Sequence, residues 1–381
     1  MPSAAEEQLA ITPSVVQWAR VRAGYSLDEA KKYFKKIEQW ELGDARPTYR
    51  QLEIMADKFK CPVAVFFFPT PPTITPVQNS FRTLPTEDFE QIPRTVKAFL
   101  RKGQAMQLNL SELNDGKNPA GRLITRDLQA SVDESLDTLA VRVRNFLGIT
   151  LQEQIAQRSV EDAVEHWRDA FARAGVYAFK DAFHAQGFFG FCLYDSEFPI
   201  IYVNNSCAKT RQLFTLFHEL AHLLFHTSGI DIDNDAFIDK LGYADKRVEI
   251  ICNAFAAKFL VPDQDFDAQL VGRVGNRDTA ELLANRYKVS REVIYRRMLD
   301  RRLISAAEYQ AAANTWASQK SDQSSGGNYY YNQITYLGPR YIDLALARFH
   351  QGRFDDIRLS EYLNIKPRNL STFEFTYEDS R

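Results

Sequence analysis

Residues 214–226 of this 381-residue chain read FTLFHELAHLLFH. Every residue in this stretch is compatible with a helix, and apolar side chains occur on nearly all sides of it, which is typical of a buried helix. Within it lies His218-Glu219-Leu-Ala-His222. Residues four apart lie on the same face of a helix, one turn from each other, so both imidazoles are able to bind one metal ion.

Two histidines and a carboxylate inside a buried helix need partners, because burying them unpaired costs several kcal/mol. A Zn²⁺ ion would provide partners for His218 and His222, and Glu219 would then be the base that acts on water at the ion. The alternative is a core helix whose histidines are satisfied by hydrogen bonds. The adjacent carboxylate of Glu219 favours the metal, because two histidines with a neighbouring glutamate are the arrangement of a zinc hydrolase.

The third ligand has to come from another segment. His226 lies eight residues after His218, which places it about 12 Å away along the helix axis and too far to share the ion. Glu249 lies in the next helical segment, predicted over residues 246–261. It is either a surface charge that complements the helix dipole or a ligand. We expect Glu249 to be the ligand, with Asn253 on the same face holding an imidazole through its free N–H.

Apolar runs rich in aromatic and β-branched residues predict two strands before this helix, at residues 187–194 and 199–203. Such strands are either ordinary core sheet or include an edge that pairs with an extended substrate. The segment after the helix is polar and is predicted to be a solvated loop. It contains five aspartates: Asp231, Asp233, Asp235, Asp239 and Asp245.

Several motifs occur in a fixed order between roughly residues 162 and 303. They are a strand at 200–205, His218-Glu219-x-x-His222, and Glu249-x-x-x-Asn253 followed by Leu260-Val261-Pro262. Together they resemble the ImmA/IrrE family of metallo-endopeptidases. The resemblance implies a compact bacterial zincin that cleaves a regulatory protein, typically a helix-turn-helix repressor or an antitoxin, and so relieves repression. The other hypothesis is a DNA-binding regulator or antitoxin that uses the zincin fold as a non-catalytic binding platform.

Residues 1–72 resemble an XRE-type helix-turn-helix domain. A first helix is predicted at residues 13–22, and Ser26-x-x-Glu29 is the capping box of a second helix. Between Ala30 and Trp40 the chain is about four residues shorter than the family's usual spacing. The segment has ten Lys and Arg against nine Asp and Glu, so it lacks the basic excess typical of duplex-binding modules. Contact with DNA and contact with protein both stay open.

The fold class predicted for the whole chain is mainly α, with an α+β minimal zincin between helical modules. A helical connector is expected at 73–160, the zincin at 161–262, a helix-turn-helix-like extension at 263–317, a flexible linker at 318–328, and a small helical module at 329–381. Residues 273–302 contain nine Lys and Arg against four Asp and Glu. This basic stretch is either a nucleic-acid contact or a helical support of the catalytic domain.

Composition limits the remaining choices. The net charge is −2, so no general attraction to polyanions is expected. The chain begins without an apolar leader and has no long apolar run, and we expect neither a signal peptide nor a membrane span. The cysteines are widely spaced and lie beside apolar residues, which predicts reduced, buried thiols in a cytoplasmic protein: Cys61, Cys192, Cys207 and Cys252.

Overall fold

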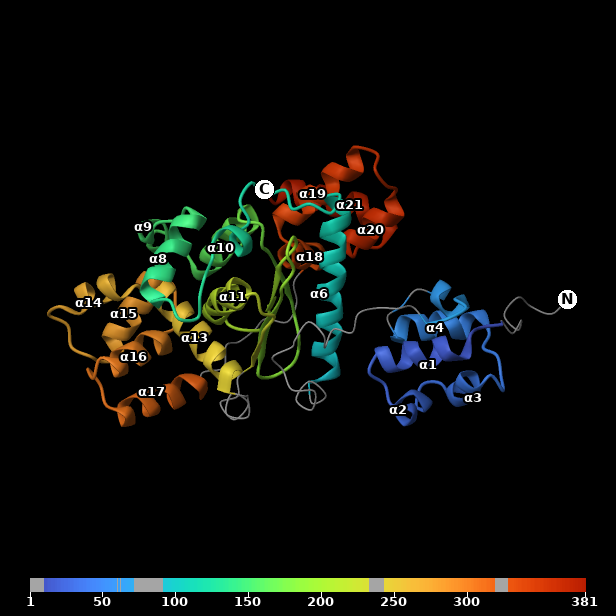
Figure 1. Cartoon of the computed structure of the whole chain (residues 1–381), viewed down its shortest axis with the longest axis horizontal. Coiled ribbons are helices and arrows are strands. Elements are labelled where there is room, and N and C mark those ends of the chain that lie inside the picture. Colours follow the sequence, from blue (N-terminus) through green and yellow to red (C-terminus); the bar gives the residue numbers. More distant parts are fainter. Residues whose placement is uncertain (1–9, 60, 62, 72–91, 233–242, 319–327) are drawn as a thin grey trace. The chain divides into compact units, whose positions relative to one another are not determined.

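The computed structural model describes residues 10–59, 61, 63–71, 92–232, 243–318 and 328–381, and Figure 1 shows the elements they form. Contacts divide the chain into two compact units, residues 1–79 with 91–98 and residues 80–90 with 99–381. Almost all of the predicted linker lies outside the described residues, as do Asp233, Asp235 and Asp239. Among the described helices, none is long and apolar enough to cross a membrane.

The first unit is a small helical cluster. The predicted first helix and the reciprocal hydrogen bonds of the Ser26–Glu29 capping box are confirmed. The second and third helices have only five and six residues, in the segment where the sequence is short. DNA binding by this unit stays a prediction. Its elements are α1 (Pro13–Arg22), α2 (Leu27–Lys31), α3 (Ile37–Leu42), α4 (Tyr49–Phe59) and η1 (Val63–Phe67).

The second unit is built around a four-stranded sheet with the order β1-β3-β2-β4. β1 and β3 are parallel, and the other two pairs are antiparallel. The two predicted strands are confirmed as β2 and β3, whereas β1 and β4 were not predicted. The four strands are β1 (Tyr177–Asp181), β2 (Phe188–Leu193), β3 (Ile200–Asn204) and β4 (Ile230–Ile232).

A layer of helices packs on one face of this sheet, with α11 in direct contact with β2 and β3. Gly190 permits the close approach, because a Cβ there would lie 2.5 Å from Thr215 Cγ2 and 2.7 Å from the Tyr202 carbonyl oxygen. The chain is therefore mainly helical with a small sheet, as the predicted fold class has it. α10 (Val160–Arg173) and α11 (Lys209–Leu224) lie against the strands, and α13 (Tyr243–Leu260) and α8 (Leu136–Leu147) pack on these two helices.

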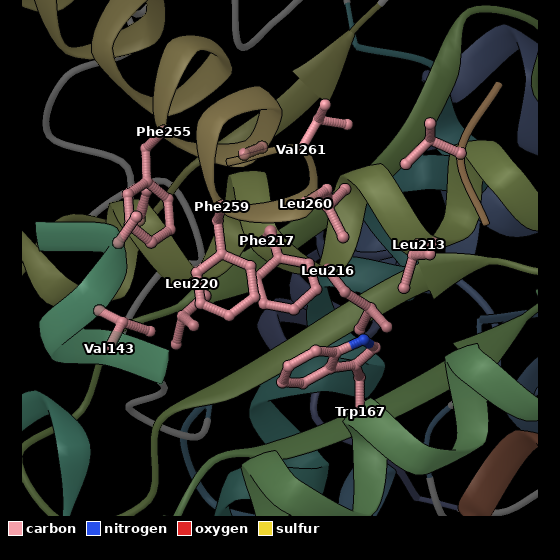
Figure 2. Close-up of a cluster of buried hydrophobic side chains, with 14 of the residues drawn as sticks. Val143, Trp167, Leu213, Leu216, Phe217, Leu220, Phe255, Phe259, Leu260 and Val261 are labelled. Atoms are coloured by element: carbon pink, nitrogen blue, oxygen red, sulfur yellow. The ribbon is translucent and has the colours of Figure 1, made fainter. Parts of the chain in front are cut away.

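The core of the second unit lies between α11, α13, α10 and α8. Figure 2 shows its aromatic centre, where Trp167 of α10 lies next to Phe217 of α11 and Phe259 of α13. All three side chains are fully buried. Leu216 and Leu220 extend the same cluster along α11. This apolar contact fixes α13 beside α11, so the two helices that carry the predicted metal ligands are held together by the core.

Part of the predicted connector belongs to this core. Val143 of α8 is fully buried in it. Arg144 donates to the Phe259 carbonyl, and the buried amide of Gln154 donates to the Leu260 carbonyl at the end of α13. These bonds fix the carboxyl end of α13. The other elements of this region are α6 (Arg94–Leu113), α7 (Ile124–Asp127) and α9 (Leu151–Ile155).

Several arginines in the basic stretch at 273–302 form ion pairs with carboxylates of the preceding helix. Arg297 is buried and pairs with Asp263, which also binds Arg301, and Arg286 pairs with Asp265. Extended back to residue 263, the stretch holds nine basic and seven acidic residues. Part of its positive charge is therefore neutralised within the fold, and a nucleic-acid contact by this stretch stays a prediction. The elements are α14 (Asp263–Leu270), α15 (Arg277–Tyr287), α16 (Arg291–Asp300) and α17 (Ala306–Ser318).

The C-terminal module packs next to β1. Arg168 of α10 donates to the carbonyls of Thr335 and Tyr336 at the end of α18, and Tyr341 of α19 lies edge-on to Phe179 of β1. This contact makes the module part of the second unit. Its elements are α18 (Tyr329–Leu337), α19 (Pro339–His350), α20 (Asp356–Leu363), η3 (Pro367–Asn369) and α21 (Leu370–Asp379).

Candidate metal centre

Residues 214–224 make up most of α11, which ends at Leu224, and Phe225 and His226 follow the helix. His218, Glu219 and His222 are buried, with 1%, 0% and 3% of their surfaces exposed. α11 is covered by the sheet on one side and by α10 and α13 on others, and this is why its sequence is apolar nearly all round. The three polar side chains therefore have to be satisfied inside the unit.

Glu249 reaches this group from α13. The helix begins at Tyr243, so Glu249 lies in its second turn rather than in the first turn as predicted. The Oε2 atom of Glu249 lies 3.4 Å from His218 Nε2, and its Oε1 atom lies 3.3 Å from His222 Nε2. One ligand atom from each of these residues lies within 4.8 Å of the other two. The structure thus brings the three predicted ligands together.

The outward nitrogens of both imidazoles are held by oxygen atoms. His218 Nδ1 lies 3.1 Å from Asn253 Oδ1, the contact expected from the spacing along α13. His222 Nδ1 lies 3.2 Å from Thr227 Oγ1, a contact the sequence did not reveal. Each Nδ1–H donates to its oxygen, which leaves the lone pair of each Nε2 free.

Four acceptor atoms consequently face a single point. The two Nε2 atoms lie 3.2 Å apart, and both oxygens of Glu249 lie against them. Burial disfavours the ionised carboxylate, but the two imidazoles outweigh it and lower the pKa of Glu249 below its usual range. Acceptors this close repel one another unless a proton or a metal ion lies between them. Two imidazoles and one carboxylate fit a divalent transition-metal ion, since this is a known donor set for one.

Glu219 lies beside this point without a partner. Both of its carboxylate oxygens are buried and neither accepts a hydrogen bond from the described residues. Burial raises the pKa of Glu219 to about 7, although His218 and His222 act in the opposite direction. A buried, partnerless carboxylate is costly for stability, which indicates a functional role.

Comparison with protein families agrees with this geometry. Residues 173–299 match the IrrE N-terminal-like domain, the model of a peptidase family. The segment that matches includes β1 to β4, α11, α13 and all four site residues. The predicted resemblance to ImmA/IrrE metallopeptidases is confirmed for this segment. No curated protein matches the chain.

His226 also lies in the IrrE-like segment, residues 173–299. It is not one of the side chains that meet at the metal centre. Its Nε2 atom lies 2.8 Å from the carbonyl oxygen of Thr125, and its ring packs on Tyr194 with centroids 4.8 Å apart. The backbone of His226 is left-handed, with φ of 57°, because α11 has already ended. The residue therefore belongs to the turn after the helix, in agreement with the spacing argument.

Asp231 is placed differently from the prediction. It lies in β4 of the IrrE-like segment and is 4% exposed, so its assignment to a solvated loop was wrong. Its carboxylate accepts hydrogen bonds from Arg211 Nη2 at 2.6 Å and Thr215 Oγ1 at 2.8 Å. Both partners lie on α11, seven and three residues before His218. A three-residue strand inside an acidic stretch leaves too short an apolar pattern to be recognised.

Proposed function

We propose that this protein is a zinc-dependent endopeptidase that cleaves a regulatory protein, either a transcriptional repressor or an antitoxin-like partner, and thereby relieves repression. One observation carries the proposal. The Nε2 atoms of His218 and His222 and the carboxylate of Glu249 converge on one point. The carboxylate of Glu219, on the same helix as the two histidines, is buried without a hydrogen-bond partner among the described residues. Such an arrangement serves hydrolysis. Without a function it would only lower the stability of the fold, because buried polar groups without partners cost free energy.

Zinc is the metal that this donor set favours. Two imidazoles and one glutamate are the protein ligands of several catalytic zinc sites, in which a fourth position is left to water or substrate. When bound, a zinc ion lowers the pKa of water to about 7 and polarises a carbonyl oxygen. His218, His222 and Glu249 would hold the ion, and their burial in the core keeps them in place.

Glu219 would carry the proton. Its carboxylate accepts a proton from the attacking water and later donates it to the amine that leaves. Both tasks require free oxygens and a pKa near the working pH. Glu219 has both, because its oxygens make no hydrogen bond and burial raises its pKa to about 7. A protein in which the site served only as a binding platform would have no physical need for this carboxylate.

The position of the sheet is consistent with a peptide substrate. β4 is the last strand of the sheet in the described part of the chain, and it begins next to His222, as the contact of Gly229 with the imidazole ring shows. An extended segment that pairs with an edge strand gains backbone hydrogen bonds with little demand on its sequence. We infer that the substrate lies along β4 with its scissile bond at the metal.

A second candidate function is a DNA contact by the first unit, as in a DNA-binding regulator. The observation that favours it is a group of exposed lysines, Lys32, Lys35 and Lys36, in and next to the turn between α2 and α3. Lysines at such a turn suit phosphate oxygens. We place both activities in the cytoplasm, where the four free cysteines would stay reduced.

Co-expression with candidate partners tests the proposed peptidase. The wild-type chain and Glu219→Gln are each expressed with helix-turn-helix repressors and antitoxins encoded nearby, and intact masses are measured. Fragments are expected with the wild type alone, while metal analysis shows the same metal content in both proteins. Equal relief of repression by Glu219→Gln would favour the non-catalytic platform.

A further inference from the structure

We propose that Thr227, Gly229 and Asp231 form a positioning element of the metal centre, in which Thr227 orients His222 and Gly229 confines its ring. The proposal rests on the metal site of the proposed function and adds residues that bind no metal themselves. It follows from three sets of contacts: those of the Thr227 hydroxyl, those of the Gly229 backbone and those of the Asp231 carboxylate.

Thr227 determines which nitrogen of His222 carries the proton. Its Oγ1 atom lies 3.0 Å from the His222 carbonyl oxygen, to which the hydroxyl donates. With its one hydrogen used in this way, Oγ1 is able only to accept from His222 Nδ1, 3.2 Å away. The proton of neutral His222 is thereby held on Nδ1. The lone pair of Nε2 then faces His218 and Glu249, where a metal ligand must present it.

Gly229 leaves no room for the ring to turn away. A Cβ at this position would lie 2.6 Å from His222 Cδ2 and 2.8 Å from Nε2. The backbone is held at this distance by Cys192 of β2, whose N–H donates to the Gly229 carbonyl at 3.0 Å and whose Sγ accepts from the Gly229 N–H at 3.2 Å. The sheet therefore holds the Gly229 backbone, which has no side chain, next to the imidazole ring of His222.

Asp231 ties the far end of the element back to α11. Its two oxygens accept from Arg211 and Thr215, so the element is attached to the same helix at His222 and again about two and three turns earlier. His218, in contrast, is oriented by Asn253 of α13. Each imidazole is thus oriented by a different segment, and the segment that orients His222 continues as β4.

Zinc affinity of the purified full-length chain tests the proposal, measured by competition with a chromophoric chelator. We expect Thr227→Val to weaken zinc binding by about 10- to 100-fold, the usual effect of removing a partner of a ligand histidine. Thr227→Ser keeps the hydroxyl and should bind zinc like the wild type. Gly229→Ala should also weaken binding, because the new methyl group displaces the ring.

Ser228→Ala is the matched control. The Ser228 hydroxyl accepts a hydrogen bond from the Tyr194 N–H at 2.9 Å, on the side of β2, and not from a metal ligand. The zinc affinity of the Ser228→Ala variant should therefore equal that of the wild type. Thermal unfolding of the metal-free proteins shows whether each variant is folded.

The outcomes separate this proposal from the proposed function. Wild-type affinity in both Thr227→Val and Gly229→Ala would overturn the positioning element and leave the peptidase intact. Equal weakening in Thr227→Val and Thr227→Ser would also overturn it, because the hydroxyl would then be irrelevant. A wild-type chain that binds no zinc would remove the metal centre, and with it both proposals.

Discussion

Phe217 of α11 and Phe259 of α13 stack with their ring centroids 4.2 Å apart and an angle of 24° between the rings. Phe217 directly precedes His218, and α13 also carries Glu249. The stack therefore sets the distance between the two helices at the metal centre. Trp167 closes the cluster from α10, with an edge-on contact to each ring.

Truncation of this stack should destabilise the second unit. Phe217 is fully buried, and Phe-to-Ala changes at such sites cost about 3–5 kcal/mol through lost contacts and a cavity. We expect Phe217→Ala to lower the unfolding midpoint in calorimetry by many degrees. Phe375→Ala is the control, because Phe375 is 71% exposed and should change stability by at most about 0.5 kcal/mol. Equal midpoints for the two variants would contradict the packing account.

Zinc binding should release protons. Burial alone would lower the pKa values of the imidazoles, but neighbouring groups outweigh it. The carboxylates of Asp231 and Glu249 raise the pKa of His218, and contacts with the Cys252 side chain and the Glu249 carboxylate raise that of His222. The raised pKa values favour protonated imidazoles in the metal-free site, and a metal ion has to displace those protons. Affinity should consequently rise with pH between about 6 and 8.

Isothermal titration calorimetry in buffers of different ionisation enthalpy measures this release. We expect at least about one proton per zinc ion at pH 7, and less as the pH rises through the raised pKa values. A binding enthalpy independent of the buffer would mean that no proton leaves, and would contradict the raised pKa values of His218 and His222.

Arg168 should hold the C-terminal module on the sheet. Besides its bonds to the Thr335 and Tyr336 carbonyls, it donates to the Ala178 carbonyl of β1 at 2.9 Å. Arg168→Met leaves the buried Ala178 carbonyl without this donor, at a cost of about 1–3 kcal/mol, and removes both bonds to the part-buried carbonyls of α18. Hydrogen exchange in α18 should therefore become faster.

Arg340→Met is the control for that experiment. Arg340 is 53% exposed and pairs with Asp169 at the surface, an interaction worth at most about 1 kcal/mol. Exchange in α18 should stay close to that of the wild type. Faster exchange in this variant but not in Arg168→Met would place the anchor of the module elsewhere.

Strong local patterns predicted much of the fold. The helix at 214–226, the capping box at Ser26 and the strands at 187–194 and 199–203 each follow from apolar periodicity or a hydrogen-bonding motif within a few residues. Glu249 was recognised because it lies in a helical segment with Asn253 four residues later. These signals come from residues close together in the sequence, and the tertiary structure agrees with the local structure that they favour.

The missed features depend on contacts between distant segments. β4 has three residues and an acidic neighbour, so its pattern is too short to recognise, and Asp231 is buried only because Arg211 reaches it from α11. Thr227 and Gly229 are ordinary turn residues in the sequence. The count over 273–302 could not show that Arg297 is paired, because its partner Asp263 lies outside that window.

Metal content tests the central claim most directly. We predict that elemental analysis of the purified wild-type chain finds about one zinc ion per chain, since His218, His222 and Glu249 form one site. Glu249→Gln should lose most of it, whereas Glu281→Gln, a change at an exposed position on α15, should not. A wild-type chain without stoichiometric metal, or full occupancy in Glu249→Gln, would contradict the account.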